Sequence, residues 1–231
     1  MITEKKREIG ISDELNFWKE FTTSNRFKEN WCTTTPNPEL NLDIEIFLSY
    51  VHSFASNEIK VLDVGSGPVS ILSRLNTIYT NLVISAADPL AEEYSTLYPS
   101  SYSESFDIQI PQKVEAEELS NFYGIEEFDI VHIRNALDHT IDPIKSLLEM
   151  NKVLKKNGFL IIHGFENEAI CENWQGMHQW NLSLEKNQLH ISNIDGVINN
   201  ASILNSIPVY SKRVSLDNEK NWITIILKKS S

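Results

Sequence analysis

A glycine turn and one aspartate are the residues of this sequence best suited to bind a ligand. The apolar segment 60–64 leads into Gly65-Ser66-Gly67, where glycines let the backbone bend sharply and let a ligand approach the main chain. Asp88 ends the next apolar segment, 21 residues after Gly67 (88 − 67). That spacing suits a carboxylate accepting two hydrogen bonds from a ribose diol, although Asp88 could instead cap a helix or a turn before proline. Ser70 stands where a dinucleotide-binding loop has its third glycine, which weakens a dinucleotide interpretation.

Three histidines could transfer a proton near neutral pH. His139 and His163 follow predicted strands at their carboxyl ends, the edge where open parallel sheets bind ligands. His178 lies in segment 174–181, whose amide and indole groups suit a polar ring or a sugar. Each has a structural alternative: His139 as a helix cap, His163 as a core residue and His178 as a surface residue. His132 falls in the middle of a predicted strand and is expected to be a packed core residue.

Strands and helices that alternate along the chain would position these residues. The predicted strands are 60–64, 82–87, 128–133 and 159–163, and the predicted helices between them are 70–75 and 143–154. Strands that are apolar on both faces and separated by helices indicate an α/β fold, with a parallel sheet covered on both sides.

The two ends of the chain differ from this central part. Residues 1–57 are predicted to form a helical lid, with one helix capped by Asp13 and a second over 40–54. In segment 182–191, apolar and polar residues alternate on both sides of Lys186-Asn187. This pattern predicts a small β-hairpin insertion. Segments 209–216 and 222–227 predict a final antiparallel hairpin on the sheet.

Length and composition limit the class of protein. A chain of 231 residues with 41% hydrophobic residues is predicted to be one domain, made of a lid (1–57), a core (58–168) and a substrate-side part (169–231). A net charge of −12 makes nucleic acid an unfavourable partner. Two cysteines without a C-x-x-C pair, no signal peptide and no apolar run of membrane-spanning length favour a cytoplasmic protein.

Four motifs in order resemble those of the class I S-adenosylmethionine-dependent methyltransferases. They are the glycine turn, Asp88 with Pro89, the acidic stretch 113–119, and the run 128–139 that ends Asn-Ala-Leu-Asp-His. The last motif is similar to that of methyltransferases from bacterial polysaccharide gene clusters. The resemblance covers residues 58–165 and implies a Rossmann-like, seven-stranded, mostly parallel sheet whose last strand is antiparallel.

The resemblance also implies a role for each matched residue. The methionine part of S-adenosylmethionine would lie against Asp63, Gly65, Ser66 and Gly67, and the ribose on Asp88. Pro89, Leu90, Ala116 and Glu117 would border the adenine, and Asn135 and Leu137 would pack under the sulfonium. Val69 stands where many relatives have glycine, so this loop is expected to be stiffer.

Methyl transfer to oxygen needs an acceptor held in line and a base. The candidates for activating the acceptor are His139, His163 and Asp138, and those for binding it are Glu166, His178, Trp180, Trp18 and Trp31. The sequence therefore predicts an O-methyltransferase that acts on a small polar acceptor and releases S-adenosylhomocysteine. A sugar, a nucleotide-sugar or a related precursor of a bacterial surface polysaccharide is the first expectation.

Other interpretations stay open at this point. Asp138, Glu166 and Asn167 resemble the oxygen ligands of magnesium-dependent O-methyltransferases, although their positions are shifted, and no metal is expected. A nicotinamide-dependent oxidoreductase would share the glycine turn but lacks a Tyr-x-x-x-Lys pair. A non-catalytic cofactor-binding relative or partner subunit, a methyltransferase for another small metabolite and a homo-oligomer are further alternatives.

Overall fold

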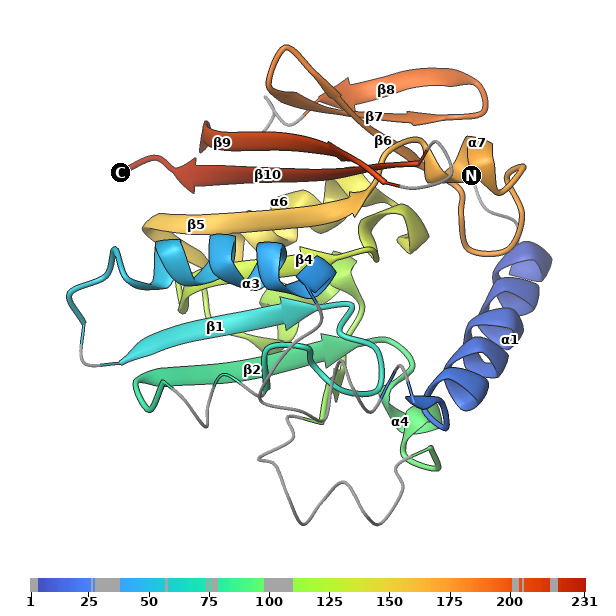
Figure 1. Cartoon of the computed structure of the whole chain (residues 1–231), viewed down its shortest axis with the longest axis horizontal. Coiled ribbons are helices and arrows are strands. Elements are labelled where there is room, and N and C mark those ends of the chain that lie inside the picture. The colour runs from blue at the N-terminus through green and yellow to red at the C-terminus, as the bar shows by residue number, and fades with distance from the viewer. Residues whose placement is uncertain are drawn as a thin grey trace.

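A seven-stranded sheet forms the centre of the protein (Figure 1). The structure, a computed structural model, describes residues 4–25, 27, 38–56, 58–73, 75, 79–97, 110–200, 204, 206–216 and 220–231. The strands of the sheet are β1 (Ile59–Val64), β2 (Leu82–Asp88), β3 (Gln112–Lys113), β4 (Phe128–Arg134), β5 (Leu154–Phe165), β9 (Ser206–Ser215) and β10 (Asn221–Lys229). The helices are α1 (Glu4–Phe21), α3 (Pro38–Val51), α4 (Ala91–Tyr94), α5 (Leu119–Phe122), α6 (Pro143–Val153) and α7 (Glu168–Cys171), with short 3-10 turns η2 (Ala116–Glu118) and η3 (Leu137–His139).

The strand order is β3-β2-β1-β4-β5-β10-β9. Strands β1 to β5 pair in parallel, and β10 pairs antiparallel with both β5 and β9. The predicted α/β fold with its antiparallel last strand is therefore confirmed. The parallel strands end at a common edge, at Val64, Asp88, Arg134 and Phe165.

Alternate residues of each strand point to opposite sides of the sheet. Both sets of residues are largely apolar, so both faces of the sheet are apolar. On one face Leu62 and Val64 pack with Leu147 and Met150 of α6. On the other face Val61 packs with Phe47 of α3. Asp142 starts α6 as its N-cap and accepts hydrogen bonds from the backbone N–H groups of Ile144 and Lys145. The helices thus hold the strand ends in fixed positions.

Helix α1 stands at the carboxyl edge of the parallel strands, apart from the layer that α3 forms (Figure 1). It begins at Glu4, so Asp13 lies inside the helix, and its predicted role as the cap is wrong. Segment 70–75, which was predicted to be helical, turns as a 3-10 helix where it is described. Its described bonds are of the 3-10 type, from the N–H of Ser73 to Ser70 and from that of Leu75 to Leu72.

The predicted hairpin insertion is a separate sheet of three strands, β6 (Asn181–Glu185), β7 (Gln188–Asn193) and β8 (Gly196–Asn200). The turn at Lys186-Asn187 was predicted correctly, and both residues have positive φ there. The third strand was missed. Figure 1 shows this sheet beyond β9 and β10, on the side away from β1 and β2.

Candidate active site

A cavity of about 680 Å³ lies at the carboxyl edge of the parallel strands. Strand ends form its floor, and α1 contributes a wall through residues such as Glu14 and Trp18. Most of the residues predicted for cofactor or acceptor contact line it: Trp18, Asp63, Gly65, Ser66, Gly67, Asp88, Pro89, Leu90, Ala116, Glu117, Asn135, His139 and His178. The fold thus gathers these scattered positions around one volume.

The backbone of the glycine turn requires glycine at positions 65 and 67. Gly65 and Gly67 have φ of +62° and +65°, a region that residues with a Cβ rarely adopt. A Cβ at position 65 would lie 2.4 Å from the Cβ of Ala136, and one at 67 would lie 2.5 Å from the Trp18 ring. The turn therefore lets the backbone approach both the β4 loop and the lid helix closely.

Asp88 is buried at the end of β2, and both of its oxygens accept a backbone hydrogen bond. The N–H of Gly67 donates to Oδ2 and the N–H of Leu90 donates to Oδ1, each at 2.9 Å. Burial raises the pKa of this carboxyl to about 7; the two hydrogen bonds oppose this, and Glu14 and Glu115 add to it. Each oxygen keeps a further lone pair with which it can accept from a ligand.

Asp63 and Glu117 line the cavity but also hold its walls together. Asp63 bonds to the Nδ1 of His132 at 2.7 Å and accepts from the hydroxyl of Ser70 at 2.6 Å. Glu117 accepts from the N–H groups of Ile141 and Asp142, at 2.8 and 3.0 Å. His132 is buried, as its position in the middle of the strand suggested.

Asn135 is held in a strained backbone conformation at the end of β4. Its φ is +51°, and its N–H donates to the carbonyl of His163 at 2.8 Å. Its side-chain Oδ1 is buried and has no hydrogen-bond partner among the described residues. Strain and an unpaired buried acceptor are features that occur at ligand sites.

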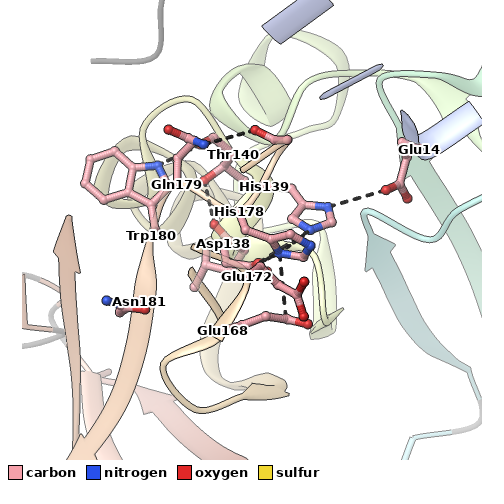
Figure 2. Close-up of polar contacts among 12 residues, drawn as sticks. Glu14, Asp138, His139, Thr140, Glu168, Glu172, His178, Gln179, Trp180 and Asn181 are labelled. Carbon is pink, nitrogen blue, oxygen red and sulfur yellow. Dashed lines mark hydrogen bonds and ion pairs between the residues drawn. The ribbon is translucent and has the colours of Figure 1, made fainter. Parts of the chain in front are cut away.

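Asp138, His139 and His178 form a cluster at one end of the cavity (Figure 2). The Nδ1 of His178 lies 2.9 Å from Asp138 Oδ2 and 3.2 Å from His139 Nε2. The same His139 nitrogen lies 3.4 Å from Asp138 Oδ2. Asp138 is almost fully buried, whereas the side chains of His139 and His178 are 17% and 25% exposed. The two imidazoles can therefore be reached from the cavity and the carboxylate cannot.

Each charged group of this cluster shifts the pKa of its neighbours. Burial alone would raise the pKa of Asp138, but His139 and His178 hold that pKa below its usual value. Burial would lower the pKa of His178, but its bond to Asp138 raises it. Glu168, 4.0 Å from His178, has its pKa raised to about 7 by burial and by the charge of Asp138. The cluster thus holds a carboxylate, an imidazole that binds a proton readily and a second carboxyl that is easily protonated.

The lid helix contacts both ends of the cavity. Arg7 forms an ion pair with Glu115. Glu14 accepts from the indole N–H of Trp18 at 2.6 Å, and its other oxygen lies 3.8 Å from His139 Nδ1. Helix α1 therefore lies over the ligand edge, whereas α3, which also belongs to the predicted lid of residues 1–57, packs on a face of the sheet.

Besides Asp138, four predicted site residues among the described residues lie outside the cavity lining. His163, proposed as a base, is buried, with its Nδ1 2.9 Å from Thr224 Oγ1 and 3.2 Å from Asp43 Oδ1. Glu166, proposed to bind substrate or magnesium, accepts instead from Arg213, Asn221 and the N–H of Leu184. These two assignments are corrected, because β9 and β10 supply partners that fix both side chains. The magnesium set is not assembled, since Glu166 faces Arg213.

Trp180 and Leu137 are also structural. The indole N–H of Trp180 donates to the carbonyl of Thr140 at 2.9 Å, so this side chain fastens the loop and does not reach the acceptor. Leu137 is buried in the core. Ala136 lines the cavity in its place. Trp31 lies outside the described residues.

Several lining residues were missed by the sequence analysis. Glu168 begins α7, two residues after Glu166, and could have been found by the strand-end rule that selected Glu166. Arg7 and Glu14 could not have been found from the sequence. No local motif distinguishes a site residue from the other charged residues of a helix. Glu115 lies within a motif that was identified, but its ion pair with Arg7 depends on the lid.

The comparisons with known proteins agree with this geometry. Residues 42–196 match a family model described as "Methyltransferase domain", and the chain belongs to this methyltransferase family. It is therefore an enzyme of the methyltransferase class. No curated protein sequence matches the chain.

Solved structures with a similar fold include three N-methyltransferases. The 1,6-didemethyltoxoflavin-N1-methyltransferase of Burkholderia thailandensis, with S-adenosylhomocysteine bound, is 14% identical over 100% of this chain and 92% of its own, with a TM-score of 0.58. NodS of Bradyrhizobium japonicum, with S-adenosylhomocysteine, is 12% identical over 94% and 99%, with a TM-score of 0.57. Phosphoethanolamine N-methyltransferase 2 of Haemonchus contortus, with S-adenosylmethionine, is 13% identical over 93% and 56%, with a TM-score of 0.59. Each of these three structures contains S-adenosylmethionine or S-adenosylhomocysteine.

No helix among the described residues is long and apolar enough to cross a membrane.

Proposed function

We propose that this methyltransferase transfers a methyl group from S-adenosylmethionine to a hydroxyl of a small polar acceptor. The observation that carries the proposal is that one cavity contains both a carboxylate suited to a ribose and two imidazoles of the His–Asp cluster that an acceptor can reach. The carboxylate is required to hold the cofactor, and an imidazole is required to remove the proton of a hydroxyl.

The residues at the cofactor end suit S-adenosylmethionine. Asp88 would accept from the two ribose hydroxyls while the N–H groups of Gly67 and Leu90 keep it in place. The buried Oδ1 of Asn135, which lacks a partner among the described residues, is an acceptor available to the ammonium of the methionine part. Gly65 leaves no room for a side chain and so keeps the turn close to the ligand. When bound, this cofactor supplies an electrophilic methyl group on a sulfonium.

The histidine cluster would activate the acceptor. Asp138 holds His178 through a 2.9 Å bond and raises its pKa, which leaves His139 as the imidazole placed to accept a proton from a hydroxyl in the cavity. Glu14 lies beside the other nitrogen of His139 and would stabilise the imidazolium that forms. His139 is therefore the proposed base, and Asp138 and His178 are positioning residues.

A sugar or nucleotide-sugar is the proposed acceptor class. The polar groups at this end of the cavity include Arg134, Thr140 and His178, which can pair with several hydroxyls. The similarity of the Asn-Ala-Leu-Asp-His motif to enzymes of polysaccharide gene clusters supports the same class. The amides of segment 174–181 do not, because the side-chain N–H of Gln179 donates to the carbonyls of Trp174 and Gly176. A cytoplasmic location stays a prediction.

An amine is the second candidate acceptor. The carboxyl groups of Glu14 and Glu168 line the same end of the cavity and could hold a protonated amine. The three compared structures are N-methyltransferases by their names. Amines therefore belong in the same screen as sugars.

The test is methyl transfer from labelled S-adenosylmethionine to panels of saccharides, phosphosugars, nucleotide-sugars and amines. Labelled product and S-adenosylhomocysteine should form with a member of the first three panels. His139→Ala should lower the rate by about 100-fold or more, with cofactor affinity unchanged. His52→Ala, an exposed histidine on another surface, is the matched control. Product from the amine panel alone would replace the hydroxyl proposal with the second candidate.

A further inference from the structure

We infer that Asp138, His139 and His178 form a binding site for one divalent transition-metal ion, with Glu168 beside it. The site itself is independent of methyl transfer, whereas its role in activating the acceptor rests on the proposed function. A metal at this cluster was not expected from the sequence, because the oxygen ligands considered there included Glu166 and Asn167 and no histidine.

The separations of the ligand atoms fit a common ion. His139 Nε2, His178 Nδ1 and Asp138 Oδ2 are 2.9, 3.2 and 3.4 Å apart in pairs. Ligand atoms about 2.0–2.1 Å from one ion, at tetrahedral or octahedral angles, are themselves roughly 2.9–3.4 Å apart. Three atoms on three side chains therefore already have the mutual spacing of a coordination sphere.

Protons alone pair these three atoms poorly. The Nδ1–H of His178 can donate to Asp138 or share its proton with His139 Nε2, but the lone pairs of His139 and Asp138 then face each other at 3.4 Å. If His139 Nε2 carries a proton as well, two N–H groups face each other at 3.2 Å. A divalent cation accepts a lone pair from all three atoms at once.

The surroundings of His139 favour the form that binds metal. Its Nδ1 lies 3.8 Å from Glu14 Oε2. Figure 2 marks this contact between His139 and Glu14 with a dashed line. The contact favours the proton on Nδ1 and leaves the Nε2 lone pair for an ion. A carboxylate next to the non-ligating nitrogen is the usual arrangement for a metal-binding histidine.

Glu168 provides a second, independent observation. Its side chain is only 8% exposed, and Oε2 is buried without a hydrogen-bond partner among the described residues. That oxygen lies 4.0 Å from His178 Nδ1. Figure 2 shows the Glu168 side chain next to His178. An unpaired buried carboxylate oxygen is costly, and a hydrogen bond from a water molecule on the ion would satisfy it.

The donor set indicates the class of metal. Two imidazole nitrogens with one carboxylate suit Zn²⁺, Co²⁺, Mn²⁺ or Fe²⁺, whereas Mg²⁺ prefers oxygen ligands alone. Because His139, His178 and Glu168 line the cavity, a further coordination position would face the acceptor. A hydroxyl bound there would have a lower pKa and would lose its proton more easily, so the ion would take over the activation that His139 provides without metal.

The test is titration of the chelator-treated full chain with Co²⁺ alone, followed by visible absorption, with Mg²⁺ as the comparison ion. One Co²⁺ should bind per chain, with the d–d absorption of a four- or five-coordinate site that contains nitrogen. His139→Ala and His178→Ala should each weaken binding at least about 100-fold. Glu168→Gln should weaken it less, and His52→Ala should leave it unchanged.

S-adenosylhomocysteine binding, measured on the same samples, separates the two proposals. Absence of Co²⁺ binding in a protein that binds S-adenosylhomocysteine would overturn the metal site and leave the proposed function standing. Co²⁺ binding that persists in both histidine variants would also overturn it, since the ion would then sit elsewhere. Site-dependent Co²⁺ binding without S-adenosylhomocysteine binding would support the metal site and contradict the proposed function.

Discussion

The two ends of the cavity are built in different ways. The cofactor end uses Asn135 and residues between Asp63 and Glu117, each at the end of a strand or in the turn that follows it. The acceptor end combines Glu14 of α1, His139 of η3, Glu168 of α7 and His178 from the loop before β6. A ligand shared by a whole family can be held by local motifs of the sheet, whereas an acceptor site is assembled from segments that meet only in the folded chain.

The two ends also differ in how they stabilise charge. Asp88 is held by two backbone N–H groups, which cannot be lost by substitution of a side chain. Asp138 is held by two imidazoles, so its environment depends on residues 138, 139 and 178 together. Substitutions at one end should therefore affect cofactor affinity, and substitutions at the other should affect the rate of transfer.

The largest expected effect is that of Gly65→Ala at the cofactor end. The new Cβ would meet Ala136 at 2.4 Å in a backbone conformation unfavourable for alanine, so the turn must move. We expect S-adenosylhomocysteine affinity to fall at least about 100-fold, with about 1–3 kcal/mol lost from the free energy of unfolding. Calorimetric titration and thermal unfolding would measure both.

Gly164→Ala is the matched control for that experiment. It lies in β5, where the added Cβ would be 3.6 Å from Leu182, an ordinary contact. If Gly65→Ala bound S-adenosylhomocysteine as tightly as Gly164→Ala, the close approach at the glycine turn would have no role in binding.

A smaller effect is expected from pH, again at the cofactor end. Burial raises the pKa of Asp88 to about 7, and the ribose hydroxyls require its ionised form as acceptor. At pH 6 only about a tenth of the molecules carry that charge, so S-adenosylhomocysteine should bind about 10-fold more weakly at pH 6 than at pH 8. Titrations at pH 6 in buffers of different ionisation enthalpy should show proton release on binding. Affinity that is constant or falls between pH 6 and pH 8 would contradict the assignment.

The smallest effect on function is expected from His163→Ala. His163 is buried between Asp43 and Thr224, and burial lowers its pKa, so it acts in the core as a neutral residue. We expect the variant to lose about 2–3 kcal/mol of the free energy of unfolding and to keep the transfer rate per folded molecule within about threefold. Denaturant unfolding and the labelled-methyl assay would measure these quantities. A loss of rate as large as that of His139→Ala would restore His163 as a candidate base.

The cofactor end could be predicted from sequence because its residues follow apolar strands at fixed spacings. The acceptor end was only partly predictable. His178 is 39 residues from His139 (178 − 139), and Glu14 precedes the whole sheet. The rule that strand ends bind ligands selected His163 and Glu166 wrongly. It failed because of the last two strands of the chain: β10 pairs with β5, and β9 pairs with β10. These strands bring Thr224 to His163 and Arg213 to Glu166.

The central claim is that the cavity binds S-adenosylmethionine and its product with Asp88 on the ribose. The most direct measurement is calorimetric titration of S-adenosylhomocysteine into the unmodified chain, Asp88→Ala and Asp129→Ala, with NAD as a control ligand. Asp129→Ala removes a carboxylate at the opposite end of β4, where Asp129 pairs with Lys155. The account predicts binding that is weakened at least about 100-fold in folded Asp88→Ala alone, and no binding of NAD. Equal S-adenosylhomocysteine affinity in both variants, or binding of NAD in its place, would contradict it.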